Sequence, residues 1–109
     1  MTLRQKQPRL RDPGYLKWLR RQRCACGCLQ APPCDAAHLR STSFEYGKTI
    51  GWGVPDDRWA LPLKHSHHMA QHAHGDELDW WAARGVADPF ALCIEYYERY
   101  QRSDHDERY

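Results

Sequence analysis

The chain has 109 residues, of which 41% are hydrophobic and 28% charged, and its formal net charge at pH 7 is +2. This length predicts one small domain with a single modest core. The sequence contains neither a run of about 18 apolar residues nor the apolar stretch of a signal peptide. We therefore expect a cytoplasmic protein with no membrane partner.

The first half of the chain is basic and the second half acidic. Residues 1–48 contain ten Lys and Arg against three Asp and Glu, whereas residues 49–109 contain six against eleven. A basic half can bind a polyanion such as nucleic acid, although a basic run is usually just a solvated surface.

Turn and capping residues divide the first part of the chain. Residues 1–11 are polar and basic, which predicts a flexible arm before the domain. Asp12 and Pro13 are typical of an N-cap and a first helical turn, so we expect a helix that ends at about residue 21. Residues 23–28 contain a glycine and three cysteines, and they predict a tight turn that presents thiolates to a metal ion.

Two strands and a long loop are expected next. Residues 34–40 predict a strand that carries His38, and residues 58–63 predict a second strand, which Pro62 restricts to a sheet edge or a bulge. The glycine-rich loop between them, residues 41–57, is long for so small a domain, which favours a functional role.

Three helices are expected in the second half. The predicted ranges are about 66–74, ending at a glycine, about 76–84, and about 89–102, which begins with a second Asp-Pro pair. The apolar stripe of the last helix is typical of core packing. The domain is thus predicted over residues 12–102, followed by a charged tail at 103–109.

The histidine pattern predicts metal chemistry. Five of the seven histidines fall between His65 and His74, and His38 lies upstream. His68 and His72 are four residues apart, so on a helix both imidazoles lie on one face and can bind the same ion. A histidine from elsewhere in the fold can act as a base. Scattered surface histidines are the alternative interpretation.

The order of these parts resembles an HNH endonuclease of the small type found in phages and prophages. Four motifs carry the resemblance, in the order DAAHLR at 35–40, GWGVPDDRWALPL at 51–63, HH with a later H at 67–72, and DPFAL at 88–92. The resemblance implies an α+β fold with a small ββα-metal (HNH) core, formed by a two-stranded hairpin and a helix. An N-terminal helix and two C-terminal helices would flank this core.

The resemblance also implies an activity, the metal-dependent hydrolysis of phosphodiester bonds in DNA. His38 would be the general base, because a neutral imidazole can take a proton from water. His68 and His72 would hold one divalent ion (Mg, Mn, Ni or Zn) against the phosphate and the departing 3′-oxygen. The candidates for phosphate contacts are Arg40, Lys48 and Arg58.

Two positions depart from the family pattern around this site. Ala37 stands where a metal-binding His or Asp usually precedes the base, and Asp35 can replace that ligand only if the strand is bulged. Trp59 stands where an asparagine often holds the loop, so that Asp56 or Asp57 would have to do this work.

A third departure concerns the structural zinc that many relatives bind. Lys64 occupies the place of their helix-side cysteine. Zinc can still be bound by two or three of the clustered thiolates with His65 or His67. The candidate set is Cys24, Cys26, Cys28 and His67; the alternative is that the cysteines are reduced and unliganded.

Two rival functions belong to other classes. The first is a catalytically inactive, metal-stabilised nucleic-acid-binding module, which Ala37 favours. The second is a phage accessory protein that acts through a protein partner bound to the acidic, aromatic C-terminal half. Trp52, in the glycine-rich loop, is the tryptophan we consider for substrate contact, whereas Trp59, Trp80 and Trp81 are expected in the core.

Overall fold

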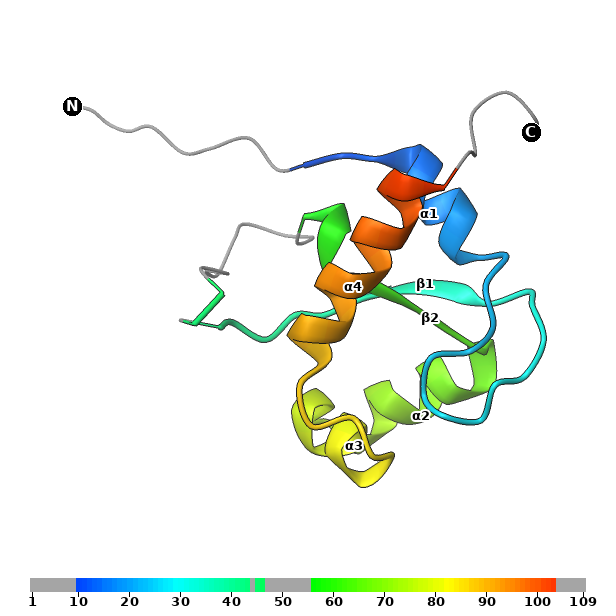
Figure 1. The fold of residues 1–109 in the computed structure, drawn as a ribbon. Coiled ribbons are helices and arrows are strands. Elements are labelled where there is room, and N and C mark those ends of the chain that lie inside the picture. Colours follow the sequence, from blue (N-terminus) through cyan, green and yellow to red (C-terminus); the bar gives the residue numbers. More distant parts are fainter. Residues whose placement is uncertain (1–9, 44, 47–55, 104–109) are drawn as a thin grey trace.

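The computed structural model describes residues 10–43, 45–46 and 56–103, and this part of the chain has an α+β fold (Figure 1). Its elements in chain order are α1 (Pro13–Leu19), β1 (Asp35–His38), the 3₁₀ helix η1 (Asp57–Trp59), β2 (Ala60–Leu63), α2 (His65–His74), α3 (Glu77–Ala83) and α4 (Pro89–Arg102). The two strands form an antiparallel hairpin, as predicted.

The predicted helix starts are confirmed by their capping hydrogen bonds. The side chain of Asp12 accepts from the backbone N–H of Tyr15 at 3.1 Å, and Asp76 and Asp88 cap α3 and α4 in the same way. The first helix ends at Leu19, two residues earlier than expected. Gly75 ends α2 with φ of +94°, a backbone conformation that favours glycine.

The hairpin is shorter than the sequence suggested. β1 and β2 pair from Asp35 opposite Leu63 to His38 opposite Ala60 without a bulge. The predicted second strand began two residues too early, because the three residues of η1 turn the chain before β2. Pro62 lacks a backbone N–H, which a sheet tolerates at an edge. The sheet has only two strands, so one edge of β2 has no neighbouring strand and Pro62 fits there.

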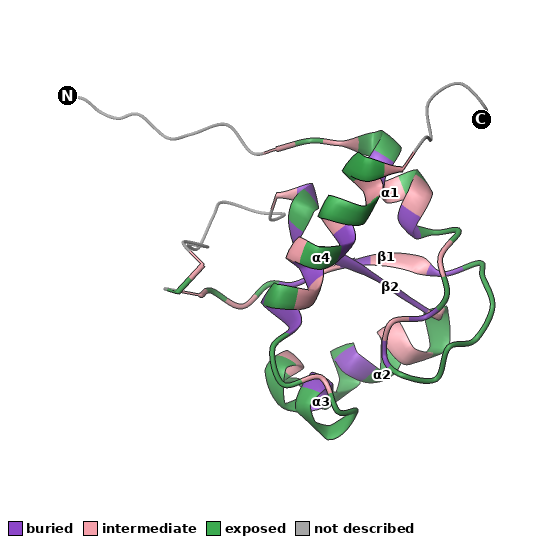
Figure 2. Cartoon of the chain, in the orientation of Figure 1, coloured by how far each residue is buried: buried purple, intermediate pink, exposed green. Residues whose placement is uncertain are grey.

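The core lies between the hairpin and the helices α1, α3 and α4. Helix α4 crosses the hairpin (Figure 1). Helix α1 lies on one side of the hairpin, and α2 and α3 lie on the opposite side. Figure 2 shows β2 buried along its whole length. The expected core tryptophans are buried, with exposed fractions of 7% for Trp59, 5% for Trp80 and 1% for Trp81. The rings of Tyr15 and Tyr97 meet edge to face at 4.8 Å between centroids, which joins α1 to α4.

The described residues begin and end within two residues of the predicted domain limits, 12 and 102. Of the arm predicted at 1–11, only residues 10 and 11 are within the described ranges. Leu10 is held there, because its N–H donates to Oδ1 of Asp56 at 2.8 Å and its carbonyl accepts from the N–H of Asp57 at 3.0 Å. Of the predicted tail, only Ser103 is described, and its N–H donates to the carbonyl of Arg99 at 3.0 Å.

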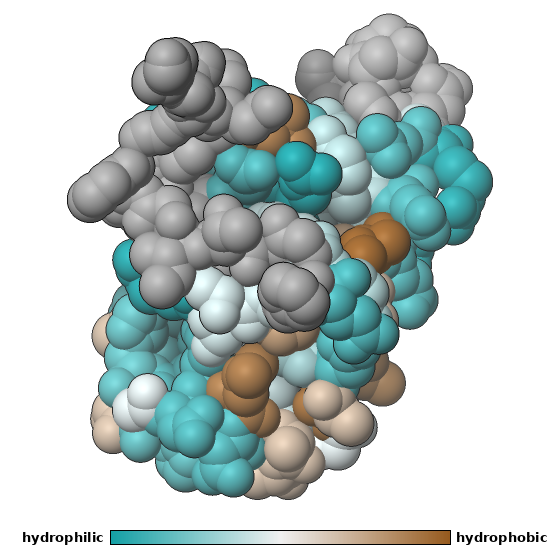
Figure 3. Space-filling view, turned by 90° about the vertical axis from the view of Figure 1, so that its left-hand side faces the viewer, coloured by the Kyte–Doolittle hydropathy of each residue, from teal (hydrophilic) through white to brown (hydrophobic). Residues whose placement is uncertain are grey.

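The described part of one face of the molecule is largely polar. On the face drawn in Figure 3, hydrophilic residues predominate and hydrophobic residues form separate patches between them. Within the described residues, every helix is too short or too polar to cross a lipid bilayer.

Candidate metal centres and active site

Three thiols and one imidazole converge between the turn after α1 and the first turn of α2. The ligand atoms of Cys24, Cys26, Cys28 and His67 all lie within 4.8 Å of one another. The distances from Nδ1 of His67 to the three sulfur atoms are 3.6 Å (Cys24), 3.2 Å (Cys26) and 3.7 Å (Cys28). With Zn–S and Zn–N bonds of about 2.3 Å and about 2.1 Å, tetrahedral ligands are about 3.6–3.8 Å apart. The cluster therefore fits a zinc-like ion.

Backbone contacts hold the turn against the start of α2. The N–H of Cys24 donates to the carbonyl of Gln30 at 3.0 Å, which closes the turn. Gly27 has φ of +99° within it, a conformation that a residue with a side chain adopts only with strain. The N–H of Ala25 donates to the carbonyl of Pro62 at 2.8 Å, which fixes the turn to β2.

Lys64, which stands where the HNH pattern would have a zinc-binding cysteine, makes structural contacts here. Its Nζ donates to the carbonyls of Ala31 and Pro33, each at 3.0 Å, and its N–H points to Sγ of Cys24 at 3.4 Å. The lysine thus ties the cysteine segment to the start of α2, while His67, one turn further on, supplies the fourth ligand atom.

The pKa values of two thiols in the cluster shift in opposite directions. Burial, together with the neighbouring Cys24 and Cys28 thiols, raises the pKa of Cys26 to about 12. Burial also acts to raise the pKa of Cys28, but hydrogen bonds from the backbone of Gln30 and from the other thiols outweigh it and lower that pKa. Binding of an ion must therefore displace the proton of Cys26, which makes metal affinity depend on pH.

His38 is held by a buried carboxylate. Its Nε2 lies 2.9 Å from Oδ1 of Asp57, which is 6% exposed. Of the two aspartates considered for holding the loop, Asp57 is the one that contacts His38. Asp56 instead accepts from Leu10 and pairs with Arg58 at 3.1 Å. When Nε2–H donates to Asp57, Nδ1 keeps its lone pair and can accept a proton.

The helix-borne histidine pair is brought together as predicted. Nε2 of His68 lies 3.2 Å from Nε2 of His72. Two nitrogens that share one ion at about 2.1 Å are about 3.0–3.4 Å apart at octahedral or tetrahedral angles, so the pair fits a divalent ion. In the absence of an ion, one of these nitrogens can donate a hydrogen bond to the other.

Asp35 lies behind this pair. Its Oδ2 is 2.9 Å from Nδ1 of His68 and 2.8 Å from Nδ1 of His65. Burial acts to raise the pKa of Asp35, but the hydrogen bonds with the two histidines outweigh it and hold that pKa below its usual range. A carboxylate on Nδ1 fixes the tautomer that leaves Nε2 free for a metal, which is the usual arrangement behind a metal-binding histidine.

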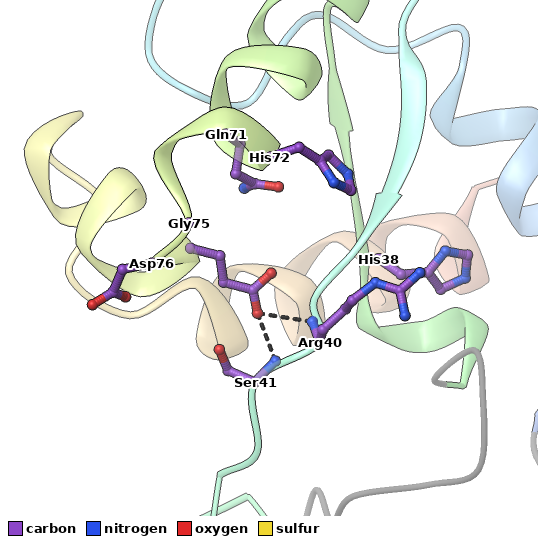
Figure 4. Close-up of a pocket in the computed structure, with 8 residues that line it drawn as sticks. His38, Arg40, Ser41, Gln71, His72, Gly75 and Asp76 are labelled. Atoms are coloured by element: carbon purple, nitrogen blue, oxygen red, sulfur yellow. Dashed lines mark hydrogen bonds between the residues drawn. The ribbon is translucent and has the colours of Figure 1, made fainter.

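A cavity of about 540 Å³ lies between the end of β1 and the helices α2 and α3 (Figure 4). His38 and His72 both line it, with Arg40, Ser41, Gln71, Gly75, Asp76 and Glu77. One carboxylate oxygen of Glu77 accepts from the backbone N–H groups of Arg40 at 2.8 Å and Ser41 at 2.6 Å. This contact fixes the end of β1 to the first turn of α3.

The predicted phosphate-binding residues have different surroundings. Arg40 lines the cavity, whereas Arg58 pairs with Asp56 and does not line it. Lys48 and Trp52 lie outside the described residues. Gln71 and Glu77 line the cavity but were not candidates from the sequence, because a single polar residue on a helix carries no spacing signal.

Comparisons with protein-family models, with curated proteins and with solved structures found no match to this chain.

Proposed function

We propose that this chain is a metal-dependent endonuclease of the HNH type that hydrolyses phosphodiester bonds in DNA. The proposal is carried by one observation: His38, held by Asp57, lines the same cavity as His72, whose Nε2 faces that of His68. Hydrolysis of a phosphodiester requires a base and a metal ion, and here a candidate base and one of the two candidate metal ligands line one opening.

In this proposal His38 takes a proton from the water that attacks phosphorus. Its free nitrogen, Nδ1, is the accepting atom, because Nε2 faces the carboxylate of Asp57. The same carboxylate stabilises the imidazolium that forms, and it holds the ring in one orientation. Arg40, at the end of β1, supplies a positive charge for a phosphate at the cavity.

His68 and His72 would hold the divalent ion, with Asp35 orienting His68. When bound, the ion supplies a Lewis acid that offsets negative charge on the phosphate and the departing oxygen. Water would complete its coordination, since Ala37 offers no ligand, and Mg²⁺ commonly keeps several waters.

The cluster of three cysteines and His67 would hold a structural zinc. Four protein ligands close the coordination shell, which is typical of structural rather than catalytic zinc. His67 directly precedes His68, so an ion at the cluster would also fix the position of α2 and of the histidine pair.

A nucleic-acid-binding module without turnover is the second candidate. The observation that favours it is the ligand set at the histidine pair, where Ala37 replaces a ligand and Asp35 faces the Nδ1 side of His68. A site with two protein ligands can be too weak to hold the ion during turnover, while the fold and the basic residues would still bind DNA.

Nicking of supercoiled plasmid tests the proposal. Wild type and the variants His38→Ala, His72→Ala and His74→Ala are stripped with chelator and then given Mg²⁺, Mn²⁺, Ni²⁺ or Zn²⁺ in turn. His74 is the matched control, because it pairs with Asp79 and does not line the cavity. We expect metal-dependent nicking that falls by about 100-fold or more in the first two variants and persists in the control.

Two other outcomes would count against this proposal. Wild-type rates for His38→Ala would contradict its role as the base. No cutting with any ion, combined with DNA binding that weakens as salt rises, would support the inactive binding module.

A further inference from the structure

Helix α1 and the turn after it carry exposed positive charge. Residues 13–34 contain four Lys and Arg and no Asp or Glu. Lys17 and Arg20 are three residues apart, so they lie on the same face of the helix, and both are exposed. Arg23 follows in the turn, where one of its N–H groups donates to the carbonyl of Leu29 at 3.0 Å. We call Lys17, Arg20 and Arg23 the α1 basic surface.

No carboxylate neutralises this surface within the part of the chain that the structure describes. None of its three cations forms an ion pair with the described Asp and Glu residues. The surfaces of soluble domains usually mix charges of both signs, so that a patch of one sign requires an explanation. A clustered group of Lys and Arg on one face of a domain is the electrostatic footprint of a nucleic-acid-binding surface.

The opposite face of α1 fixes the position of these cations. Tyr15 and Leu19 lie on that face and are fully buried in the core. The carbonyl of Arg20 accepts from the N–H of Cys34 at 3.0 Å, which ties the end of the helix to the residue before β1. The cations are therefore carried by a held backbone, so binding a partner would order only their side chains.

Basic residues elsewhere lie close to acidic groups. Arg58 and Arg99 each form an ion pair with a carboxylate, at 3.1 Å and 2.9 Å. Arg40 lines the cavity together with two carboxylates, those of Asp76 and Glu77. Residues 65–103 contain six Asp and Glu against three Lys and Arg. Within the described residues, the strongest attraction for a polyanion is therefore at α1.

We propose that the α1 basic surface binds the phosphate backbone of duplex DNA, outside the cavity that contains the candidate active site. The inference rests on the proposed function for the choice of DNA as the polyanion. Duplex DNA carries one charge for about every 1.7 Å of its axis, and seven helical residues span about 10 Å, so several phosphates can face α1. Contacts of this kind supply affinity and position the duplex, and they do not depend on its sequence.

The test measures how DNA affinity depends on salt. Fluorescence anisotropy of a labelled duplex oligonucleotide is recorded with zinc-loaded protein over a range of salt, without added Mg²⁺ or Mn²⁺, and a denaturing gel checks that the oligonucleotide stays intact. In the double variant Lys17→Gln/Arg20→Gln, we expect the slope of log affinity against log salt to fall by about two, and affinity at about 0.15 M salt to fall about 30-fold. Adding Arg23→Gln should lower the slope by about one more.

A second double variant controls for net charge. Arg84→Gln/Arg99→Gln removes the same charge from the acidic part of the chain, where Arg84 lies 4.5 Å from the ring centroid of Trp80 and Arg99 pairs with Glu95. It should leave the slope close to that of wild type. The unfolding temperature of Lys17→Gln/Arg20→Gln should equal that of wild type, because both side chains are exposed and form no ion pair within the described residues.

An equal fall of the slope in the two double variants would overturn the inference, because binding would then follow net charge and not this surface. Wild type that does not bind the duplex would also overturn it, whether or not it binds vesicles that contain phosphatidylserine. Plasmid nicking is scored separately. Binding through the α1 basic surface without cutting would contradict the nuclease proposal alone, whereas nicking by wild type with an unchanged slope in Lys17→Gln/Arg20→Gln would overturn this inference alone.

Discussion

Nε2 of His38 lies 2.9 Å from Oδ1 of Asp57, and the other oxygen of the same carboxylate accepts from the backbone N–H of Asp12 at 2.7 Å. His38 ends β1, Asp57 begins η1, and Asp12 caps α1. One buried carboxylate therefore joins three elements and also orients the candidate base. The residue that positions the chemistry is at the same time part of the structure of the domain.

Replacing Asp57 should accordingly destabilise the fold. We expect Asp57→Ala to lower the free energy of unfolding by about 1–3 kcal/mol, because the N–H of Asp12 and the imidazole of His38 both lose a buried acceptor. Denaturant unfolding measures this. Asp56→Ala is the control: Asp56 accepts one backbone N–H, from Leu10, but its other partner is the half-exposed Arg58, so its loss should cost less. An equal loss in the two variants would contradict the joint role of Asp57.

The thiol cluster makes a prediction about metal content. Cys26→Ser should lose the bound zinc, because it removes one of four ligands, whereas Cys34→Ser should retain one zinc per chain. Cys34 is a suitable control because it is also buried but is not one of the four ligands. Elemental analysis of purified protein gives the stoichiometry, and chelation should lower the unfolding temperature of wild type more than that of Cys26→Ser. Zinc retained by Cys26→Ser would exclude this ligand set.

Much of the fold followed from local signals in the sequence. The Asp-Pro pairs at Asp12 and Asp88 marked two helix starts, because an aspartate cap and a proline in the first turn act within a few residues. The i, i+4 spacing of His68 and His72 likewise placed both rings on one face of α2. These features depend on residues that are neighbours in the chain.

The rest depended on contacts between distant residues. The sequence named Asp56 and Asp57 only as residues that could hold the loop, and it did not predict that Asp57 contacts His38, because that contact depends on how η1 turns the chain before β2. The sequence also gave no reason to single out Gln71, because a polar residue on a helix is usually exposed. Its burial, at 5% exposed, follows only from how α2 packs in the folded chain.

The carboxylate behind the histidine pair makes a prediction about metal affinity. Asp35→Ala should weaken divalent-ion binding at His68 and His72 by about 10–100-fold, because Asp35 fixes the tautomer of His68. Isothermal titration calorimetry, in which Mn²⁺ is added to the zinc-loaded protein, measures this affinity. His65→Ala is the control, because His65 contacts the same oxygen of Asp35 but its side chain is 74% exposed. Equal losses in both variants would argue against an orienting role for Asp35.

The contact between α4 and α1 should make stability fall at alkaline pH. Burial, helped by the hydrogen bond that its hydroxyl donates to Oδ2 of Asp12 at 2.9 Å, raises the pKa of Tyr97 to about 12. A group whose pKa is raised on folding contributes stability that is complete below its unfolded pKa, here about 10, and that is lost as pH rises through about 12. Wild type should therefore exceed Tyr97→Phe by about 1 kcal/mol at neutral pH, and this difference should disappear by pH 12. Denaturant unfolding at a series of pH values measures it, and a difference that stays constant from neutral to alkaline pH would show that the phenol stabilises the fold by packing alone.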